Sequence, residues 1–162
     1  MSVRAGEGVN SHGLDARHRG PRGPVILGTL SSRPHPEAED AAIGAALDSG
    51  APLVIVNSVT MPLLPLTLYL VGATGAVLPE EEDLAAVRAS AERAAAQGVS
   101  VNHLRLVARD PVSALTSVAH DRRAGLLVFG PDPQRIGLRR FRRAARKVRK
   151  RADCLVLVLP WE

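Results

Sequence analysis

Short aliphatic runs alternate along this chain with helix-like segments, and this alternation constrains the fold more than any other feature. The runs stand at 24–30 (PVILGTL), 52–56 (PLVIV), 125–130 (GLLVFG) and 154–159 (CLVLVL). A strand that is buried on both faces reads as a continuous apolar run, which is typical of parallel sheets. Strands joined by crossover helices lie parallel, with right-handed connections. The pattern therefore predicts an α/β domain with helices on both faces of a parallel sheet.

Start and stop signals mark the connecting helices. Pro36 suits the first turn of a helix, and Gly50 suits a helix end. Asp110 is a good N-cap, and Pro111 follows it at the first helical position. A further strand at 99–108 mixes apolar with polar residues, so we expect it nearer the sheet edge. The predicted helices are 36–50, 80–97, 110–120 and 138–152.

Length and composition fit one compact domain at 24–162, since the chain has 162 residues and is 46% hydrophobic. Residues 1–23 mix Gly, Arg, His and Ser without apolar periodicity, which predicts a disordered N-terminal arm. Cys154 is the one cysteine, so no intrachain disulfide forms, and no signal segment is apparent. We expect a cytoplasmic protein.

Four segments of the chain together resemble the universal stress protein family over about residues 24–160: VILGTLSS, ALDSGAPLVIVNSV, ARDPVSALTSVAHDRRAGLLVFG and KRADCLVLVLP. The resemblance implies a single Rossmann-like domain of the adenine nucleotide alpha hydrolase type, with five parallel strands in the order 3-2-1-4-5. It also implies ATP or a related adenine nucleotide in the crevice between strands one and four. Family members commonly form homodimers through their fifth strands.

The same resemblance implies a set of nucleotide-binding positions. Those on the first two strands are Thr29, Leu30, Ser31 and Val56. Those in the loop and helix after the fourth strand are Gly130, Pro133, Gly137, Arg142 and Arg143.

Three departures from the family pattern fall within this set. The family loop reads Gly-x-x-Gly, but Gly130 is followed by Pro131, Asp132 and Pro133, and the prolines have no N–H for a phosphate. No aspartate ends the first strand. The distal Gly-Ser or Gly-Thr is replaced by Arg142 and Arg143. These departures predict lost or altered ATP binding, although arginines could rebuild an anion site.

The helix at 138–152 concentrates the positive charge of the chain. Residues 139–151 hold nine Arg or Lys and no acid, so removing nine charges from the net +5 leaves −4 on the rest. An apolar stripe of Leu138, Phe141, Ala145, Val148 and Ala152 is expected to face the sheet. Like charges at i,i+4 spacing disfavour the isolated helix, so we expect an external anion or partner. The candidate contacts are Arg139, Arg140, Arg143, Arg146, Lys147 and Lys150.

The stretch 61–78, which begins at Met61 and ends at Leu78, has no charge. Pro62, Pro65, Gly72 and Gly75 argue against a membrane-spanning helix. The remaining interpretations are a loop folded over the end of the sheet and a surface that docks a protein partner.

No catalytic constellation or paired metal-ligand spacing stands out, so we predict neither an enzyme nor a metal site. His120 and Asp121 are interpreted as a helix terminus rather than an acid–base pair. Three functional hypotheses follow. The first is a stress-response regulatory module with lost or altered ATP binding, which acts through a protein partner or as a homodimer. The second is an ATP-binding stress sensor, and the third is a basic-helix module that binds nucleic acid or another polyanion.

Overall fold

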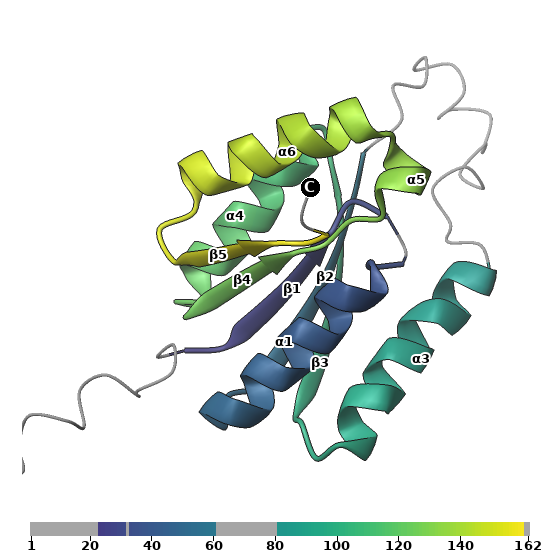
Figure 1. Ribbon diagram of the computed structural model, residues 1–162, viewed down its shortest axis with the longest axis vertical. Helices are drawn as coiled ribbons and strands as arrows, with labels where there is room; N and C mark the ends of the chain where they lie inside the picture. The colour runs from purple at the N-terminus through teal and green to yellow at the C-terminus, as the bar shows by residue number, and fades with distance from the viewer. Residues whose placement is uncertain (1–22, 32, 61–80, 161–162) are drawn as a thin grey trace, which may run out of the picture.

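A five-stranded, all-parallel sheet of order β3-β2-β1-β4-β5 forms the centre of the computed structural model, which describes residues 23–31, 33–60 and 81–160 (Figure 1). This confirms the predicted fold class and strand order. As predicted, the mixed strand β3 is at an edge, and β5 forms the other edge. The strands are β1 (Val25–Thr29), β2 (Leu53–Thr60), β3 (Val101–Ala108), β4 (Leu126–Phe129) and β5 (Leu155–Val158).

Helices cover both faces of the sheet (Figure 1). One face carries α1 (Pro36–Ser49) and α3 (Glu81–Ala96), and the other carries α4 (Pro111–Asp121) and α6 (Leu138–Arg151). The predicted N-terminal arm, apart from Gly23, and the apolar stretch 61–78 lie outside the described residues.

The register of the central strands divides their side chains between two cores. Ile26 pairs with Val54 and Leu127, and all three are buried in the core under α4 and α6. The next residue along each strand, Leu27, Ile55 and Val128, enters the core under α1. Alternate side chains of a strand point to opposite faces, so the continuous apolar runs are explained by burial on both sides.

Helix ends follow the predicted signals. Pro36 occupies the first turn of α1, and Gly50 closes it in the left-handed conformation with φ 64°. Asp110 caps α4 by accepting a hydrogen bond from the Ser113 backbone N–H.

Two local predictions need correction. A short helix, α5 (Pro133–Ile136), occupies part of the segment after the fourth strand that was expected to be a loop. In α6 the predicted apolar stripe included Leu138, but this side chain is 46% exposed, and Ala144 is buried in its place. Leu138 lies in the first turn of α6, beside α5 rather than over the sheet.

Candidate functional site

The crevice at the carboxyl ends of β1 and β4 is the place where the strand order reverses, and ligands of open α/β sheets bind there. Gly130 follows β4 at this point. Its N–H donates to the Gly28 carbonyl at 2.9 Å, and its carbonyl accepts from the His35 N–H at 2.8 Å. A Cβ added to Gly130 would lie 1.9 Å from the Cβ of Ala38. Close packing of α1 therefore accounts for this glycine without a ligand.

The backbone N–H groups of residues 134–137, in the loop after Gly130, donate hydrogen bonds within the loop. The Asp132 carboxylate caps α5 by accepting a hydrogen bond from the Gln134 N–H at 2.9 Å. The Asp132 backbone carbonyl accepts from the N–H groups of Arg135 and Ile136. The Gly137 N–H donates to the Pro133 carbonyl at 2.8 Å. Pro131 and Pro133 have no N–H to offer. The loop thus places a carboxylate where a phosphate-binding loop presents donors.

Hydrogen bonds of polar side chains also link the end of β1 to Asn57 within β2 and, through Asn57, to His103 within β3. The Ser31 hydroxyl donates to the Arg33 carbonyl at 2.8 Å, and the Ser31 N–H donates to the Thr29 hydroxyl at 3.3 Å. Asn57 donates to the Ser31 carbonyl at 2.9 Å, and its amide oxygen lies 2.7 Å from Nε2 of His103. Partial burial, together with the charge of Arg105, lowers the pKa of His103. An amide oxygen can only accept, so Nε2 of His103 is the donor in this contact. The lowered pKa favours the neutral form of the ring.

Asn57 and His103 were not among the sequence-predicted site residues. Asn57 lies opposite Thr29 in the parallel register, so a polar residue at the end of an apolar strand was the available signal.

The other positions implied by the family resemblance are scattered. Leu30 and Val56 are buried in the core under α4 and α6. Pro133 begins α5, and Gly137, with φ 82°, joins α5 to α6. Arg142 and Arg143 lie inside α6 and are exposed, so this pair does not present a helix N-terminus. The structure therefore brings Thr29, Ser31 and Gly130 to one end of the sheet and leaves the two arginines on a helix surface.

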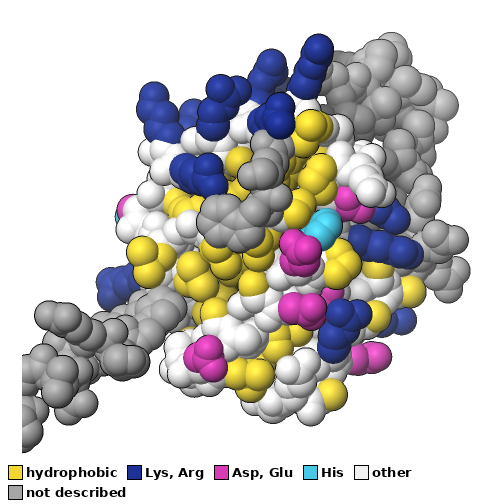
Figure 2. All heavy atoms as spheres, viewed as in Figure 1, with side chains coloured by type: hydrophobic (Ala, Val, Ile, Leu, Met, Phe, Trp, Pro, Cys, Tyr) yellow, Lys and Arg dark blue, Asp and Glu magenta, His cyan; other side chains and the backbone are white. Residues whose placement is uncertain are grey.

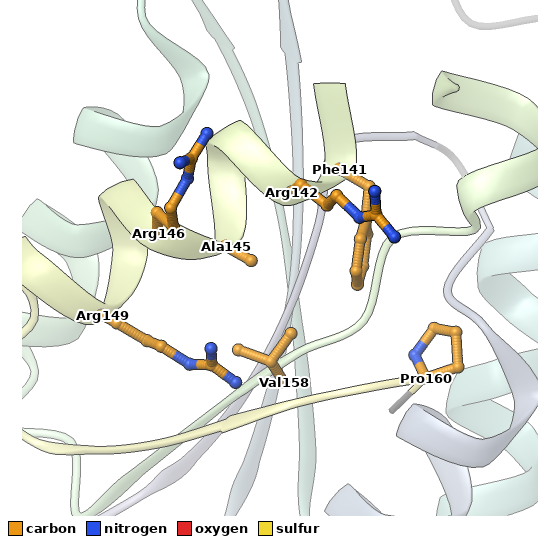
Figure 3. Close-up of a pocket in the computed structure, with 7 residues that line it drawn as sticks. All are labelled: Phe141, Arg142, Ala145, Arg146, Arg149, Val158 and Pro160. Atoms are coloured by element: carbon orange, nitrogen blue, oxygen red, sulfur yellow. The ribbon is translucent and has the colours of Figure 1, made fainter. Parts of the chain in front are cut away.

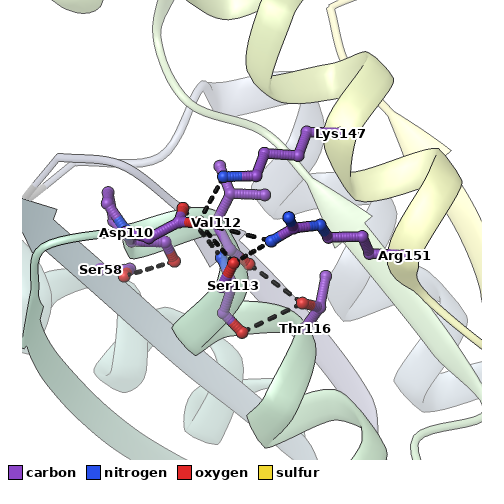
Figure 4. Close-up of polar contacts among 8 residues, drawn as sticks. Ser58, Asp110, Val112, Ser113, Thr116, Lys147 and Arg151 are labelled. Atoms are coloured by element: carbon purple, nitrogen blue, oxygen red, sulfur yellow. Dashed lines mark hydrogen bonds and ion pairs between the residues drawn. The ribbon is translucent and has the colours of Figure 1, made fainter.

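Part of the charge on α6 is neutralised from within the domain (Figure 4). The Asp110 carboxylate accepts hydrogen bonds from the Ser113 hydroxyl at 2.5 Å, from Lys147 and from Arg151 at 3.3 Å. The Lys147 ammonium and the Ser113 hydroxyl hold the pKa of Asp110 far below its usual range. Lys147 was predicted to contact an external anion, but its partner in the structure is Asp110, the N-cap of α4. The acid comes from a distant segment, so the helix sequence alone did not reveal it.

Most of the other basic side chains of α6 are exposed. Figure 2 shows Lys and Arg side chains gathered on the α6 side of the molecule, above exposed hydrophobic atoms. Arg140 donates to the Thr60 hydroxyl at 2.8 Å at the end of β2. The remaining predicted contacts are all exposed: Arg139, Arg143, Arg146 and Lys150.

His120 forms an ion pair with Asp153, with Nδ1 and Oδ2 2.5 Å apart, and so links α4 to the turn before β5. Asp153 raises the pKa of His120, and His120 lowers that of Asp153. Both side chains are more than half exposed and line a shallow surface pocket of about 380 Å³.

Within the described part of the chain, no group of three or more His, Cys, Asp or Glu side chains is placed to hold a metal ion. No helix among the described residues is both long and apolar enough to cross a bilayer.

These features define a doubly wound α/β domain with the strand order of nucleotide-binding folds, in which the loop beside the crevice is hydrogen-bonded to itself. The universal stress protein family model matches residues 22–160, and the chain belongs to this family.

Solved structures of the family share the fold. A universal stress protein in complex with cAMP is 23% identical with a TM-score of 0.58, over 86% of this chain and 97% of its own. A family protein from Burkholderia pseudomallei is 24% identical with a TM-score of 0.56, over 85% and 96%. The protein from Archaeoglobus fulgidus in complex with dAMP is 19% identical with a TM-score of 0.53, over 83% and 95%. The comparison with curated proteins gives no significant match.

Proposed function

We propose that this chain is a regulatory, non-enzymatic module of the universal stress protein family that has lost the family's mode of ATP binding and acts through protein contacts. The observation that carries the proposal is the loop at 130–137. The N–H groups of residues 134–137 are hydrogen-bonded within this loop, and Pro131 and Pro133 have no N–H for a phosphate. The carboxylate of Asp132 places a negative charge in this loop, where Arg135 at 3.9 Å compensates it in part. A helix N-terminus that is already capped by an acid offers little to a second anion.

Calorimetry with ATP, ADP and AMP at low salt tests the loop. We expect no binding in the micromolar range. A triple variant, Pro131→Gly with Asp132→Ser and Pro133→Gly, restores two backbone donors and removes the acid. It should bind ATP more tightly than the natural chain if the loop is the obstacle. Micromolar binding by the natural chain would contradict the proposal.

A nucleotide sensor is the second candidate, and the neighbouring structures favour it. One is described in complex with cAMP, another with dAMP, and a third, from Arabidopsis thaliana, with AMP bound. An adenine nucleotide with one phosphate would need fewer loop donors, and Ser31 supplies a partly exposed hydroxyl after β1. AMP binding without ATP binding in the same titration would favour this candidate.

The protein partner in our proposal includes a second copy of the chain. At the β5 edge Leu155 is 65% exposed, and an open strand edge invites pairing with another chain. Residues 61–78 are proposed as a further contact surface for a protein partner on the basis of their apolar sequence alone.

Nucleic acid or another polyanion is a third candidate. It rests on the exposed cations of α6, several of which a phosphate backbone could contact together. The described residues with aromatic rings, Phe129 and Phe141, are both buried and supply no stacking surface for bases.

A further inference from the structure

A groove of about 430 Å³ lies between α6 and the edge strand β5 (Figure 3). Its apolar lining comes from Phe141 and Ala145 of α6 and from Val158 and Pro160 at the end of β5. Sites for small molecules have volumes of about 300–1,000 Å³ and are lined mainly by apolar groups with a few polar ones. The groove has a volume and a lining of this kind.

Three arginines of α6 complete the lining: Arg142, Arg146 and Arg149. Their spacings of four and three residues place them on one side of the helix. In Figure 3 the guanidinium group of Arg142 lies beside Phe141, and that of Arg149 reaches toward Val158. Arg146 points away from the apolar lining. Two cations thus lie at opposite ends of the apolar surface.

None of the described residues that line the groove is acidic. Neither Arg146 nor Arg149 makes a hydrogen bond or ion pair within the described part of the chain. Asp110, the acid that contacts α6, instead pairs with Lys147 and Arg151, which do not line the groove. A cation beside apolar surface attracts an anion more strongly than one in open water.

We propose that this groove binds a small amphipathic anion, with an alkyl or aromatic body on the apolar lining and a carboxylate, sulfate or phosphate group on Arg149. Guanidinium groups bind such anions through paired hydrogen bonds. Apart from Arg142, the groove shares no residue with the positions that the family resemblance assigns to a nucleotide, so the proposal is independent of the crevice.

The combination of apolar floor and cationic ends favours a small anion over nucleic acid. A phosphate backbone would use the outward cations and leave the apolar floor without a function. A second copy that pairs along β5 would lie beside the groove, and the experiment below tests whether the dimer and the ligand can be present together.

The experiment titrates the full chain with decanoate by calorimetry, with decanol and inorganic phosphate as comparison ligands. We expect decanoate to bind at one site, and decanol and phosphate to bind at least about tenfold more weakly, because each lacks one of the two recognised parts. Arg149→Glu should weaken decanoate binding by about tenfold or more. Arg143→Glu makes the same charge change on an exposed residue outside the lining and should weaken it by less than about threefold.

Circular dichroism checks whether both variants are folded. If Arg149→Glu does not fold, Arg149→Met replaces it. Equal losses in Arg149→Glu and Arg143→Glu would mean general attraction by the helix and would overturn the proposal. Decanol binding as tight as decanoate would overturn the role of the arginines. Light scattering with and without decanoate completes the test: if the natural chain is a dimer and decanoate binds only as it dissociates that dimer, the floor belongs to the interface and the proposal fails.

Discussion

The carboxylate of Asp110 caps helix α4 and also pairs with Lys147 of α6, 37 residues further along the chain. One acid therefore fixes a helix N-terminus and holds a second helix against it. Arg151 reaches the same carboxylate and also donates to the Ser113 hydroxyl. The contact sets the orientation of the basic helix relative to α4.

Replacing Asp110 separates these two roles. Asp110→Ala removes the cap and the ion pairs and should lower the free energy of unfolding by about 1–2 kcal/mol, while Asp110→Asn keeps a good cap and should cost about 0–1 kcal/mol. Urea denaturation measures both. Asp121→Asn is the control, since Asp121 is exposed at the end of the same helix. Equal losses in the Ala and Asn variants would show that the cap contributes nothing.

His120 should make stability depend on pH. Asp153 raises the pKa of His120 above its ordinary value of 6.5, so the protonated, paired form is favoured by folding. A group whose pKa is raised by folding contributes fully below its unfolded pKa and loses that contribution as the pH rises through the folded pKa. The melting temperature of His120→Gln should therefore be below that of the natural chain at pH 6 and should approach it by pH 9. A constant difference at both pH values would contradict this account.

Gly130→Ala should destabilise the domain even in the absence of any nucleotide. The added Cβ would meet Ala38 at 1.9 Å, and overpacking of this kind costs about 1–3 kcal/mol. Gly44→Ala is a matched control, because Gly44 lies within α1 with no atom within 4 Å of its new Cβ. It should stabilise the helix by about 0.5–1 kcal/mol. Thermal or urea unfolding decides; a neutral Gly130→Ala would mean that α1 shifts freely.

Polyanion binding should distinguish paired from unpaired cations on α6. Arg143→Gln removes an outward charge, whereas Lys147→Gln removes one that Asp110 already neutralises. We expect Arg143→Gln to elute from heparin at lower salt than the natural chain, and Lys147→Gln to change elution less. The reverse order would show that the pairing with Asp110 does not persist in solution.

Leu155→Lys should reduce self-association through β5. The side chain is 65% exposed at the edge of the sheet, where a lysine discourages strand pairing. Light scattering should give a smaller mass for the variant than for the natural chain. Leu47→Lys, at an exposed position on α1, serves as the control. If both variants keep the mass of the natural chain, the edge of β5 is not the interface.

The strands and the main helix ends could be predicted from the sequence because their causes are local. The aliphatic runs at Val25–Thr29 and Leu126–Phe129 are too short for buried helices and have the length of buried strands. Pro36, Gly50 and Asp110 have side chains or backbone preferences that suit helix ends.

The unpredicted features depend on residues that are distant in the sequence. The pairing of Lys147 with Asp110 and of His103 with Asn57 arises only when the helices and strands are assembled. Leu138 is exposed although the predicted stripe included it, and Ala144 is buried although the stripe omitted it. Helix α6 packs against α4 as well as against the sheet, which the helix sequence alone does not reveal. The four-residue helix α5 is too short for a periodicity to indicate it.

Gly130 also bears on how such chains are classified. The Ala38 methyl group fills the space that a side chain there would need, so mutation of this glycine is opposed by helix packing whether or not a nucleotide binds nearby. During divergence the residue can therefore outlast the activity with which it is associated. A glycine after the fourth strand is consequently evidence of close helix packing and not of nucleotide binding. A search for ATP-binding members of the family should instead examine the backbone donors of the loop that follows this glycine.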